Sequence, residues 1–535
     1  MESFRQLRFP SRRSPVMAVN GMVATSQPLA ATAGLEILRH GGTAVDAAVA
    51  TAATLAVVEP MSTGIGGDAW ALVWLPGGEI KALNASGAAP AAATPAEFQR
   101  RGLQEIPLRG LLPVTVPGVV DGWAALLAAY GRRSLAQVLA PAIHYAEQGF
   151  PVSPIIARAW QATAALLRGQ PDAARTYLAD GQRAPRAGEI VRQPNLARTL
   201  WAIARGGRTV FYEGEIAESI GRYSAQHDGL LAAADLAAHQ STWVEPIWTD
   251  YRGYRLYECP PNGQGLVALL ALNLLEGFEL GSLPFGSPEA LHLQIEALRL
   301  AFADGFRYIA DPQVVPVPVA GLLDPAYTAS RRALIDPGRA ASLAHPGTPR
   351  IGDDTVYLTV VDKDGMACSL INSLYYGWGS GVVAGESGVL LQNRGAGFSL
   401  DPTHPNAIAP RKRPYHTIIP ALVTRDDQLF MSYGVMGGFM QPQGHVQVLC
   451  NIADWGMEPQ TALDAPRFRV DGNLVALEPD WPPAVRAALA ALGHQLGPVP
   501  DMGAFGGGQI VLVDPDSRAL VGASDPRKDG CAIGW

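Results

Sequence analysis

The sequence predicts an α+β layered fold, and two observations support this prediction. The first part of the chain reads as helices separated by glycine-rich turns, whereas strand-like segments dominate from Thr355 onward. Helical and strand-rich regions that follow one another along a chain are typical of proteins in which helices cover antiparallel sheets. The chain has 535 residues, of which 48% are hydrophobic and 17% charged, so it can bury a large core.

Before Thr355, the sequence predicts helices, one strand and an irregular connector. Residues 31–39 predict a helix that ends at a pair of glycines, and residues 43–58 predict a second, largely buried helix. A glycine-rich stretch at 64–68 leads into an apolar run at 70–75 that has the length of a strand. Residues 120–310 are mostly helical by pattern. Residues 321–352 are the least regular part, so we expect an exposed connector there.

The pattern changes to strands at Thr355. Residues 355–376 read as two β-rich runs joined by Asp364 and Gly365, and an Asp-Gly pair between two such runs is typical of a hairpin. Further strand-like segments lie at 421–424 and 509–514. A strand-led region therefore starts directly after the expected connector.

Composition excludes several classes of partner. The formal net charge is −7 and no dense run of lysine and arginine occurs, which does not favour nucleic acid or an anionic membrane as a partner. The basic N-terminal segment is not followed by an apolar stretch of signal-peptide length. The alanine-rich segment 44–58 contains Asp46 and is too short to span a bilayer. We therefore expect a soluble, cytoplasmic protein.

Motifs for metals and cofactors are absent from the sequence. The four cysteines form no CxxC pair, so we expect reduced core thiols. Neither an HExxH zinc motif nor a phosphate-binding GxxxxGK[ST] motif occurs, and the glycines at 64–67 do not have the strand–GxGxxG–helix order of a dinucleotide site. The expectation is that the protein uses no metal and no cofactor.

Thr355 has a position that suits nucleophilic catalysis. A threonine hydroxyl needs a base, and the α-amine of the same residue can serve if the threonine begins a chain, because that amine has a pKa of about 8. Residues 351–355 join the expected connector to a strand, as an internal cleavage site requires. From these residues alone, an ordinary strand threonine remains the alternative.

Motifs along almost the whole chain resemble the γ-glutamyltranspeptidase family, a group of N-terminal-nucleophile (Ntn) hydrolases. The matching segments occur in the order of the family and are residues 34–38, 41–48, 64–68, 116–118, 139–143, 355–357, 360–365, 379–388, 412–414, 437–438, 465–468 and 524–527. The resemblance implies a four-layer αββα sandwich. It also implies autocleavage into a large subunit, residues 1–354, and a small subunit, residues 355–535, which stay together as one intertwined heterodimer.

The resemblance assigns catalytic roles to four residues. The threonine that opens the family's small subunit falls on Thr355, and Ser373 stands where a family threonine supports the nucleophile's hydroxyl. The family's paired glycines fall on Gly437 and Gly438, whose backbone N–H groups are expected to stabilise the oxyanion.

The residues that bind the γ-glutamyl group in the family are largely replaced in this chain. Ser86 stands where the family has an arginine, and His416 and Thr417 stand where it has two serines. The family's asparagine, glutamine and aspartate are replaced by Tyr375, Arg394 and Gly397, respectively. A charge-assisted contact contributes about 1.5–3 kcal/mol, so these losses predict poor γ-glutamyl binding.

We therefore predict a small amide substrate whose acyl group lacks an α-ammonium, with a carboxylated acyl group as in the oxamate-amidohydrolase-like branch as one possibility. Arg394 and His416 are candidates to bind it. Arg394 as a structural ion-pair partner, His416 as a hydrogen-bonded core histidine and Tyr375 as a packing residue remain alternatives. So do two other functions: a true γ-glutamyl transferase or glutathione hydrolase, and an unprocessed scaffold without catalysis. Transfer to an amine acceptor and higher homo-oligomers also remain open.

Overall fold

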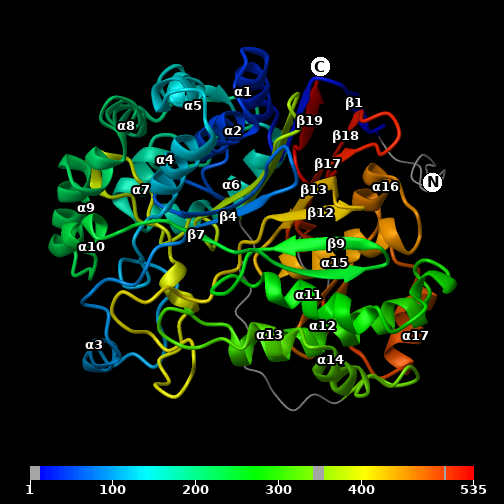
Figure 1. Cartoon of the computed structure of the whole chain (residues 1–535). Coiled ribbons are helices and arrows are strands. Elements are labelled where there is room, and N and C mark those ends of the chain that lie inside the picture. Colours follow the sequence, from blue (N-terminus) through cyan, green and yellow to red (C-terminus); the bar gives the residue numbers. More distant parts are fainter. Residues whose placement is uncertain (1–12, 342–354, 499–501) are drawn as a thin grey trace.

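Two seven-stranded antiparallel sheets form the centre of the molecule, and helices cover their outer faces (Figure 1). The computed structural model describes residues 13–341, 355–498 and 502–535. Sheet I contains, in spatial order, β1 (Val16–Ala18), β18 (Leu520–Ser524), β17 (Gly507–Val513), β13 (Gln428–Met436), β12 (Ala421–Arg425), β9 (Tyr254–Glu258) and β8 (Ile247–Tyr251). Sheet II contains β19 (Cys531–Gly534), β2 (Gly21–Thr25), β10 (Val356–Asp362), β11 (Ala367–Ser373), β3 (Asp68–Trp74), β4 (Ile80–Ala85) and β7 (Thr242–Val244).

Helices from the first half of the chain build the core on the outer side of sheet II. They are α1 (Pro28–Arg39), α2 (Ala44–Val58), α4 (Val119–Tyr130), α5 (Leu135–Gln148), α6 (Pro154–Arg168), α7 (Pro171–Tyr177), α8 (Pro194–Tyr212), α9 (Glu215–Gln226) and α10 (Ala233–Ala237). The short helix α3 (Pro95–Arg100) belongs to a separate small cluster, and β5 (Phe150–Pro151) pairs with β6 (Ile190–Val191).

A second group of helices covers sheet I. It consists of α11 (Gly265–Leu275), α12 (Pro288–Tyr308), α13 (Val319–Leu322), α14 (Pro325–Arg332), α15 (Met440–Ala453), α16 (Pro459–Asp464) and α17 (Pro483–Ala491). A small sheet of β14 (Phe468–Asp471), β15 (Leu474–Leu477) and β16 (Gln495–Leu496) lies in the same part of the fold. Between the two sheets, side chains such as Trp70, Tyr357 and Leu422 form a third apolar layer. The expected α+β fold with αββα layering is confirmed.

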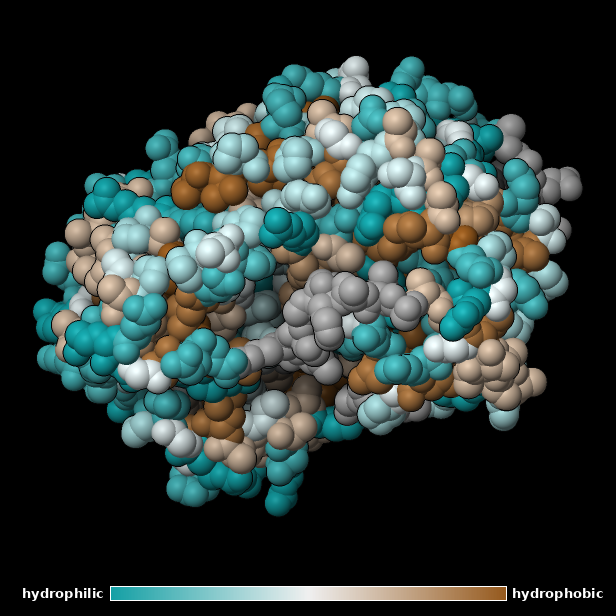
Figure 2. Space-filling view, turned by 90° about the horizontal axis from the view of Figure 1, so that it is seen from below, coloured by the Kyte–Doolittle hydropathy of each residue, from teal (hydrophilic) through white to brown (hydrophobic). Residues whose placement is uncertain are grey.

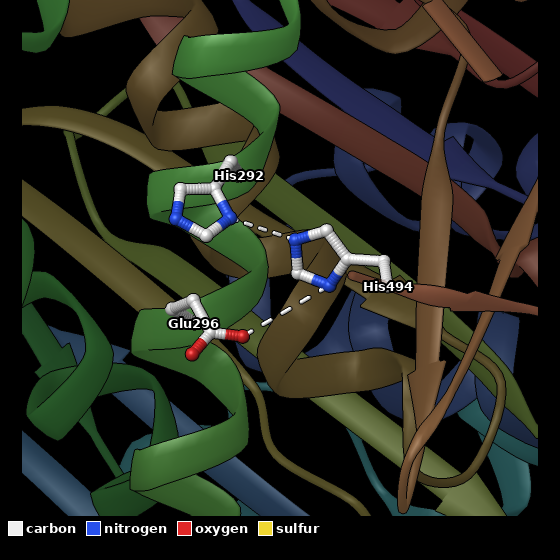
Figure 3. Close-up of side chains that lie close together, drawn as sticks. All are labelled: His292, Glu296 and His494. Atoms are coloured by element: carbon white, nitrogen blue, oxygen red, sulfur yellow. Dashed lines mark hydrogen bonds and ion pairs between the residues drawn. The ribbon is translucent and has the colours of Figure 1, made fainter. Parts of the chain in front are cut away.

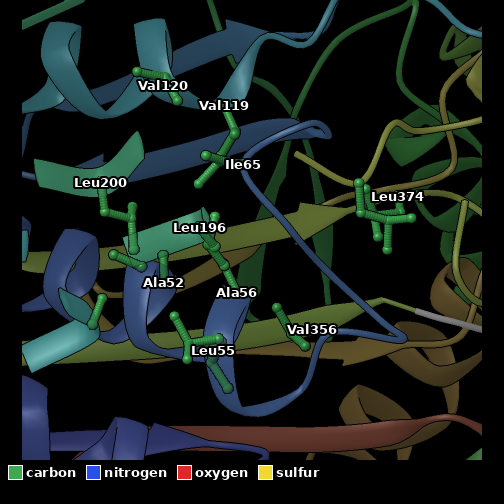
Figure 4. Packing of buried hydrophobic residues seen from close by; sticks show 14 of the residues in the cluster. Ala52, Leu55, Ala56, Ile65, Val119, Val120, Leu196, Leu200, Val356 and Leu374 are labelled. Carbon is green, nitrogen blue, oxygen red and sulfur yellow. The ribbon is translucent and has the colours of Figure 1, made fainter. Parts of the chain in front are cut away.

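Helix α2 is the central helix on sheet II, and all of its residues are buried. Its small side chains let the helix approach the sheet closely, and Figure 4 shows Ala52, Leu55 and Ala56 on α2 in the same apolar cluster as Val356 of β10. Thr43 and Asp46 form a capping box at its start. Asp362, at the end of β10, also accepts a hydrogen bond from the Ala44 N–H at 2.8 Å. The helix therefore contacts β10 at the first and the last residue of the strand.

Most expected elements occur where the sequence predicted them, with two corrections. The two first helices, the strand after residue 67, the 355–376 hairpin and the later strands are all present. The region 120–310 is not only helical, however, because β7, β8 and β9 occupy much of residues 242–258. The expected connector contains α13 and α14. Residues 342–354 of that connector, including the segment before Thr355, lie outside the described residues.

Both sheets contain strands from before and after Thr355. In sheet II, β10 and β11 lie between β2 and β3, and β19 forms an edge. In sheet I, β12 pairs with β9 and β18 pairs with β1. The sequence pattern predicts a helical region followed by a strand-rich one, whereas the two regions share both sheets and the helical layer on sheet I.

The outer surface is mixed in polarity. Figure 2 shows one face on which hydrophilic side chains predominate, hydrophobic ones form small separate groups, and a hollow lies near the centre. Among the described helices, none is long and apolar enough to cross a membrane. Cys259, Cys368 and Cys450 are buried free thiols as expected, but Cys531 on the edge strand β19 is only partly buried.

Candidate active site

Thr355 lies immediately before β10, near the middle of sheet II. The antiparallel register pairs Val356 with Asn372 on β11, which places Thr355 opposite Ser373. The two hydroxyl oxygens are 3.2 Å apart, and both residues are completely buried. The structure therefore brings together two residues that are 18 positions apart in the sequence, in hydrogen-bond contact.

Two donors point at the hydroxyl oxygen of Ser373. The Tyr375 N–H donates to it at 2.8 Å, and the Nη2 of Arg394 donates at 3.2 Å. Tyr375 has a φ of 86°, a left-handed conformation that is unfavourable for a bulky residue. Such conformations concentrate at functional sites, because the surrounding structure must hold them in place. Here the turn after β11 directs the backbone of Tyr375 back toward Ser373.

Arg394 is completely buried beside this hydroxyl pair. Its Nη1 donates to Thr417 Oγ1 at 2.7 Å, and its guanidinium lies over the ring of Tyr375, 4.2 Å from the ring centre. Its Nε has no hydrogen-bond partner among the described residues. Burial lowers the pKa of Arg394 to about 10, while Asp68 opposes that shift. The guanidinium thus stays charged at neutral pH and forms the cationic part of the site.

Asp68, at the start of β3, is the anionic partner of Arg394. Its carboxylate accepts hydrogen bonds from the N–H groups of Gly87 and Gly118, from Gln392 Nε2 at 2.8 Å and from His416 Nε2 at 3.0 Å. Burial raises the pKa of Asp68 to about 7, although the charge of Arg394 acts in the opposite direction. Asp68 therefore connects four chain segments near the site through hydrogen bonds.

His416 is a member of this polar network. Its Nε2 contacts Asp68, and its Nδ1 accepts from the Ile418 N–H at 3.4 Å. Burial, together with the charges of Arg394 and Arg413, holds the pKa of His416 well below its usual value. The ring is therefore neutral, with a proton on Nε2. These partners favour the interpretation of His416 as a hydrogen-bonded core histidine.

Ser86 is buried in a neighbouring group of polar residues. Its Oγ donates to Asn84 Oδ1 at 2.6 Å and accepts from Asn262 Nδ2 at 3.2 Å. The Asn262 carbonyl in turn accepts from the His416 N–H, and Arg413 Nε donates to the Ser86 carbonyl. Ser86 thus reaches the site through Asn262 and His416.

The paired glycines form the turn between β13 and α15. Gly437 has a φ of 119° and Gly438 a φ of 56°, both in the region that favours glycine. Gln264 Nε2 donates to the carbonyls of Gly438 and Thr417, at 2.9 and 2.6 Å. The side-chain amide of Gln264 therefore connects the Gly437–Gly438 turn, which is predicted to bind the oxyanion, with Thr417, whose hydroxyl binds Arg394.

Sequence reasoning did not single out Asp68 or Gln264. Asp68 was visible only as the last residue of the 64–68 motif, and Gln264 had no signal at all. Their partners are separated from them by up to 348 positions, as in the contact between Asp68 and His416. No local spacing reports such contacts.

The geometry and the whole-chain comparisons point to one family. A family model described as Gamma-glutamyltranspeptidase matches residues 30–535. The chain belongs to the γ-glutamyltranspeptidase family. It is a self-processing Ntn amidohydrolase of this family, and so an enzyme.

Relatives within the family have different names. The Glutathione hydrolase-like YwrD proenzyme of Bacillus subtilis (strain 168) is 39% identical and covers 97% of this chain and 99% of its own length. The Oxamate amidohydrolase proenzyme of Klebsiella pneumoniae is 36% identical with the same coverage of both. The crystal structure of cephalosporin acylase from Bacillus halodurans is 47% identical, covers 100% of this chain and 99% of that one, and superposes with a TM-score of 0.92.

Proposed function

We propose that the chain cuts itself before Thr355 and then uses the Thr355 hydroxyl to hydrolyse small amides whose acyl group has no α-ammonium. The observation that supports the nucleophile best is the 3.2 Å contact between Thr355 and Ser373. Because Tyr375 and Arg394 both donate to the Ser373 oxygen, the proton of Ser373 can be directed at Thr355 Oγ1. There it stabilises negative charge as it develops.

Self-cleavage and turnover follow the same chemistry. In cleavage, Thr355 Oγ1 attacks the carbonyl carbon of the preceding peptide and the C–N bond breaks, which frees the α-amine and leaves an ester on Oγ1. Water then hydrolyses this ester and frees the hydroxyl. In turnover, that amine takes the hydroxyl proton while Oγ1 attacks the substrate amide, and the proton passes to the leaving amine or ammonia. The N–H groups of Gly437 and Gly438 bind the oxyanion in both reactions. Water then releases the acyl group and regenerates Thr355.

The packing around Gly397 supports an acyl group without an ammonium. The family has an aspartate at this position, which pairs with the substrate's ammonium. A Cβ atom on Gly397 would lie 3.8 Å from the Tyr375 hydroxyl and 3.6 Å from the Tyr415 carbonyl. A carboxylate beyond that Cβ would therefore compete with Tyr375 for space. The asparagine-to-tyrosine and aspartate-to-glycine replacements fit together, because the larger residue fills the volume left by the smaller one.

The charge of the site supports a carboxylated or oxo-substituted acyl group. Arg394 keeps its guanidinium charged in a buried position, with one nitrogen unused among the described residues. A planar guanidinium suits the two oxygens of a carboxylate. Oxamate is the simplest such amide, and its hydrolysis consumes one water and yields oxalate and ammonia. The relative named oxamate amidohydrolase is consistent with this substrate class.

A comparison of three amides tests the proposal. The purified protein is incubated with oxamate, with glutaryl-p-nitroanilide, and with γ-glutamyl-p-nitroanilide in the presence and absence of glycylglycine. We expect release of ammonia or nitroaniline from one of the first two substrates at a kcat/KM at least about tenfold above that for the γ-glutamyl amide. The variant Thr355→Ala is the control and should be inactive on all three.

Other outcomes favour other functions. Strong, acceptor-stimulated turnover of the γ-glutamyl amide would identify a γ-glutamyl transferase and contradict the specificity proposal. A single full-length band on a denaturing gel, combined with no turnover of any amide, would identify an unprocessed scaffold. As a converse test, the double variant Tyr375→Asn with Gly397→Asp should gain γ-glutamyl hydrolysis, because it restores both family residues.

A further inference from the structure

A cluster of two histidines and a glutamate lies on the side of the molecule covered by α12. His292 and Glu296 are one turn apart on α12, and His494 lies between α17 and β16. All three are buried. Figure 3 shows the two imidazole rings facing each other beside the Glu296 carboxylate. One ligand atom from each residue lies within 4.8 Å of the other two.

The hydrogen bonds of the cluster fix the protons on the rings. His292 Nε2 lies 2.8 Å from the Asp336 carbonyl, which can only accept, so this nitrogen carries a proton. His292 Nδ1 then has a lone pair, which accepts from His494 Nε2 at 2.7 Å. As a result, His494 Nδ1 also has a lone pair. It points toward Glu296 Oε1 at 3.9 Å and has no hydrogen-bond partner among the described residues.

A buried lone pair beside a carboxylate is unfavourable without a cation between them. The separation of 3.9 Å between His494 Nδ1 and Glu296 Oε1 matches two ligands of one ion, each about 2.0–2.2 Å from it. Arg299 already pairs with the Glu296 carboxylate, so the feature that calls for an ion is the His494 Nδ1 lone pair, which lies 3.9 Å from Glu296 Oε1 and has no hydrogen-bond partner among the described residues.

We propose that His292, Glu296 and His494 bind one divalent transition-metal ion such as Zn²⁺. The ligands are Nδ1 of each imidazole and Oε1 of Glu296, and a water molecule completes four-coordination. Both rings stay neutral and keep their Nε2 protons, so binding releases no proton. The ion replaces the hydrogen bond between the two imidazoles.

The surroundings supply the outer contacts that metal ligands need. The Asp336 carbonyl accepts from His292 Nε2 and orients that ring. Arg299 Nη1 donates to Glu296 Oε1 at 2.6 Å, and the Ala341 N–H donates to Glu296 Oε2 at 2.9 Å. The carboxylate is thus held in place from two sides. Sequence reasoning expected no metal, because the two halves of the cluster are about 200 positions apart and form no HExxH motif.

The site joins parts of the chain that the proposed cleavage separates. His292, Glu296 and residues 336–341 precede Thr355, whereas His494 follows it. If the chain is cut as proposed, the ion bridges the large and small subunits and holds the segment that leads toward the cleavage point. Metal binding itself does not require the cut.

Metal titration of the full-length protein tests the site. The protein is dialysed against a chelator and titrated with Zn²⁺ in competition with a chromophoric chelator. We expect one ion per chain with a Kd below about 1 μM, together with a rise in Tm. The variants His292→Ala and His494→Ala should lose both. The variant His445→Gln is the matched control, because His445 is a buried histidine that contacts another glutamate, Glu258, at 2.6 Å.

Several results would overturn the assignment. They are the absence of any bound ion at micromolar Zn²⁺, or unchanged binding in both histidine variants. If an alanine variant does not fold, Glu296→Gln provides a second test, and Co²⁺ absorption reports directly on imidazole and carboxylate ligation. The Thr355→Ala precursor should bind the ion as the wild type does. Failure of the cleavage proposal would therefore leave the metal result intact, and the reverse also holds.

Discussion

Ser373 lies at the end of β11, where its hydroxyl contacts the proposed nucleophile and accepts from Tyr375 and Arg394. Removing this hydroxyl removes one hydrogen bond to a developing negative charge. Such a bond contributes about 1.5–3 kcal/mol, which corresponds to roughly 10- to 100-fold in rate. We expect Ser373→Ala to lower kcat and the rate of self-cleavage by that factor, with KM little changed. Steady-state kinetics and a gel time course measure both.

The matched control is Ser373→Thr, which restores the residue found at this position in the family and keeps the hydroxyl. It should retain activity within a few-fold of the wild type. Equal activity of the alanine and threonine variants would contradict the role of Ser373.

Asp68 predicts a pH-dependent stability. Burial raises its pKa to about 7, from a usual value of 3.8. The folded state therefore binds an extra proton between these values. The contribution of Asp68 is complete below pH 3.8 and is lost as the pH rises through about 7. Relative to Asp68→Asn, the Tm of the wild type should fall between about pH 4 and pH 7.

Thermal unfolding of both proteins in matched buffers measures this difference. Asp525→Asn is the control. Burial raises the pKa of Asp525, but Arg467 and Arg527 outweigh it and hold that pKa at about 2. The Tm difference for this control should be constant over the same pH range. A constant difference for Asp68→Asn as well would show that Asp68 titrates normally.

At the scale of elements, α2 depends on the carboxylate at its start. Asp46 accepts from the Thr43 N–H and from the N–H groups of Arg132 and Arg133. Asp46→Ala removes a helix cap and leaves one buried and two partly buried donors without their acceptor, so we expect the free energy of unfolding to fall by roughly 2–3 kcal/mol. Asp324→Ala, at the exposed start of α14, should cost only about 1 kcal/mol. Denaturant unfolding measures both, and equal losses would contradict the role of burial.

The same scale shows what the sequence could and could not predict. Periodicity and glycine placement predicted α1, α2 and the β10–β11 hairpin, because these elements depend on neighbouring residues. Strands β7, β8 and β9 were missed, since short strands with mixed exposure lack a clear alternation of polar and apolar residues. Motif order placed Thr355, Ser373 and the paired glycines, and the structure brings Ser373 against Thr355. It could not predict the contacts of Asp68 or the pairing of His292 with His494, because these arise only when distant segments fold together.

For the whole molecule, the mixing of strands in both sheets predicts how the protein should behave if it is cut as proposed. Both sheets contain strands from before and after Thr355, so backbone hydrogen bonds would hold the two proposed subunits together. We expect two bands on a denaturing gel but one peak by size-exclusion chromatography without denaturant. The two subunits should separate only in denaturant at concentrations that unfold the protein. Separation in buffer alone would contradict the fold as described.

The buried position of Thr355 also has a consequence for timing. A separate chain that already began at this residue would have to insert its β10–β11 hairpin between β2 and β3, in the interior of sheet II. The uncut chain avoids this problem, because the hairpin enters the sheet while still attached to the helices that pack on it. If Thr355 is the nucleophile as proposed, we expect catalytic competence to come after folding, and the two subunits produced from separate genes to recover far less activity than the same residues translated as one polypeptide.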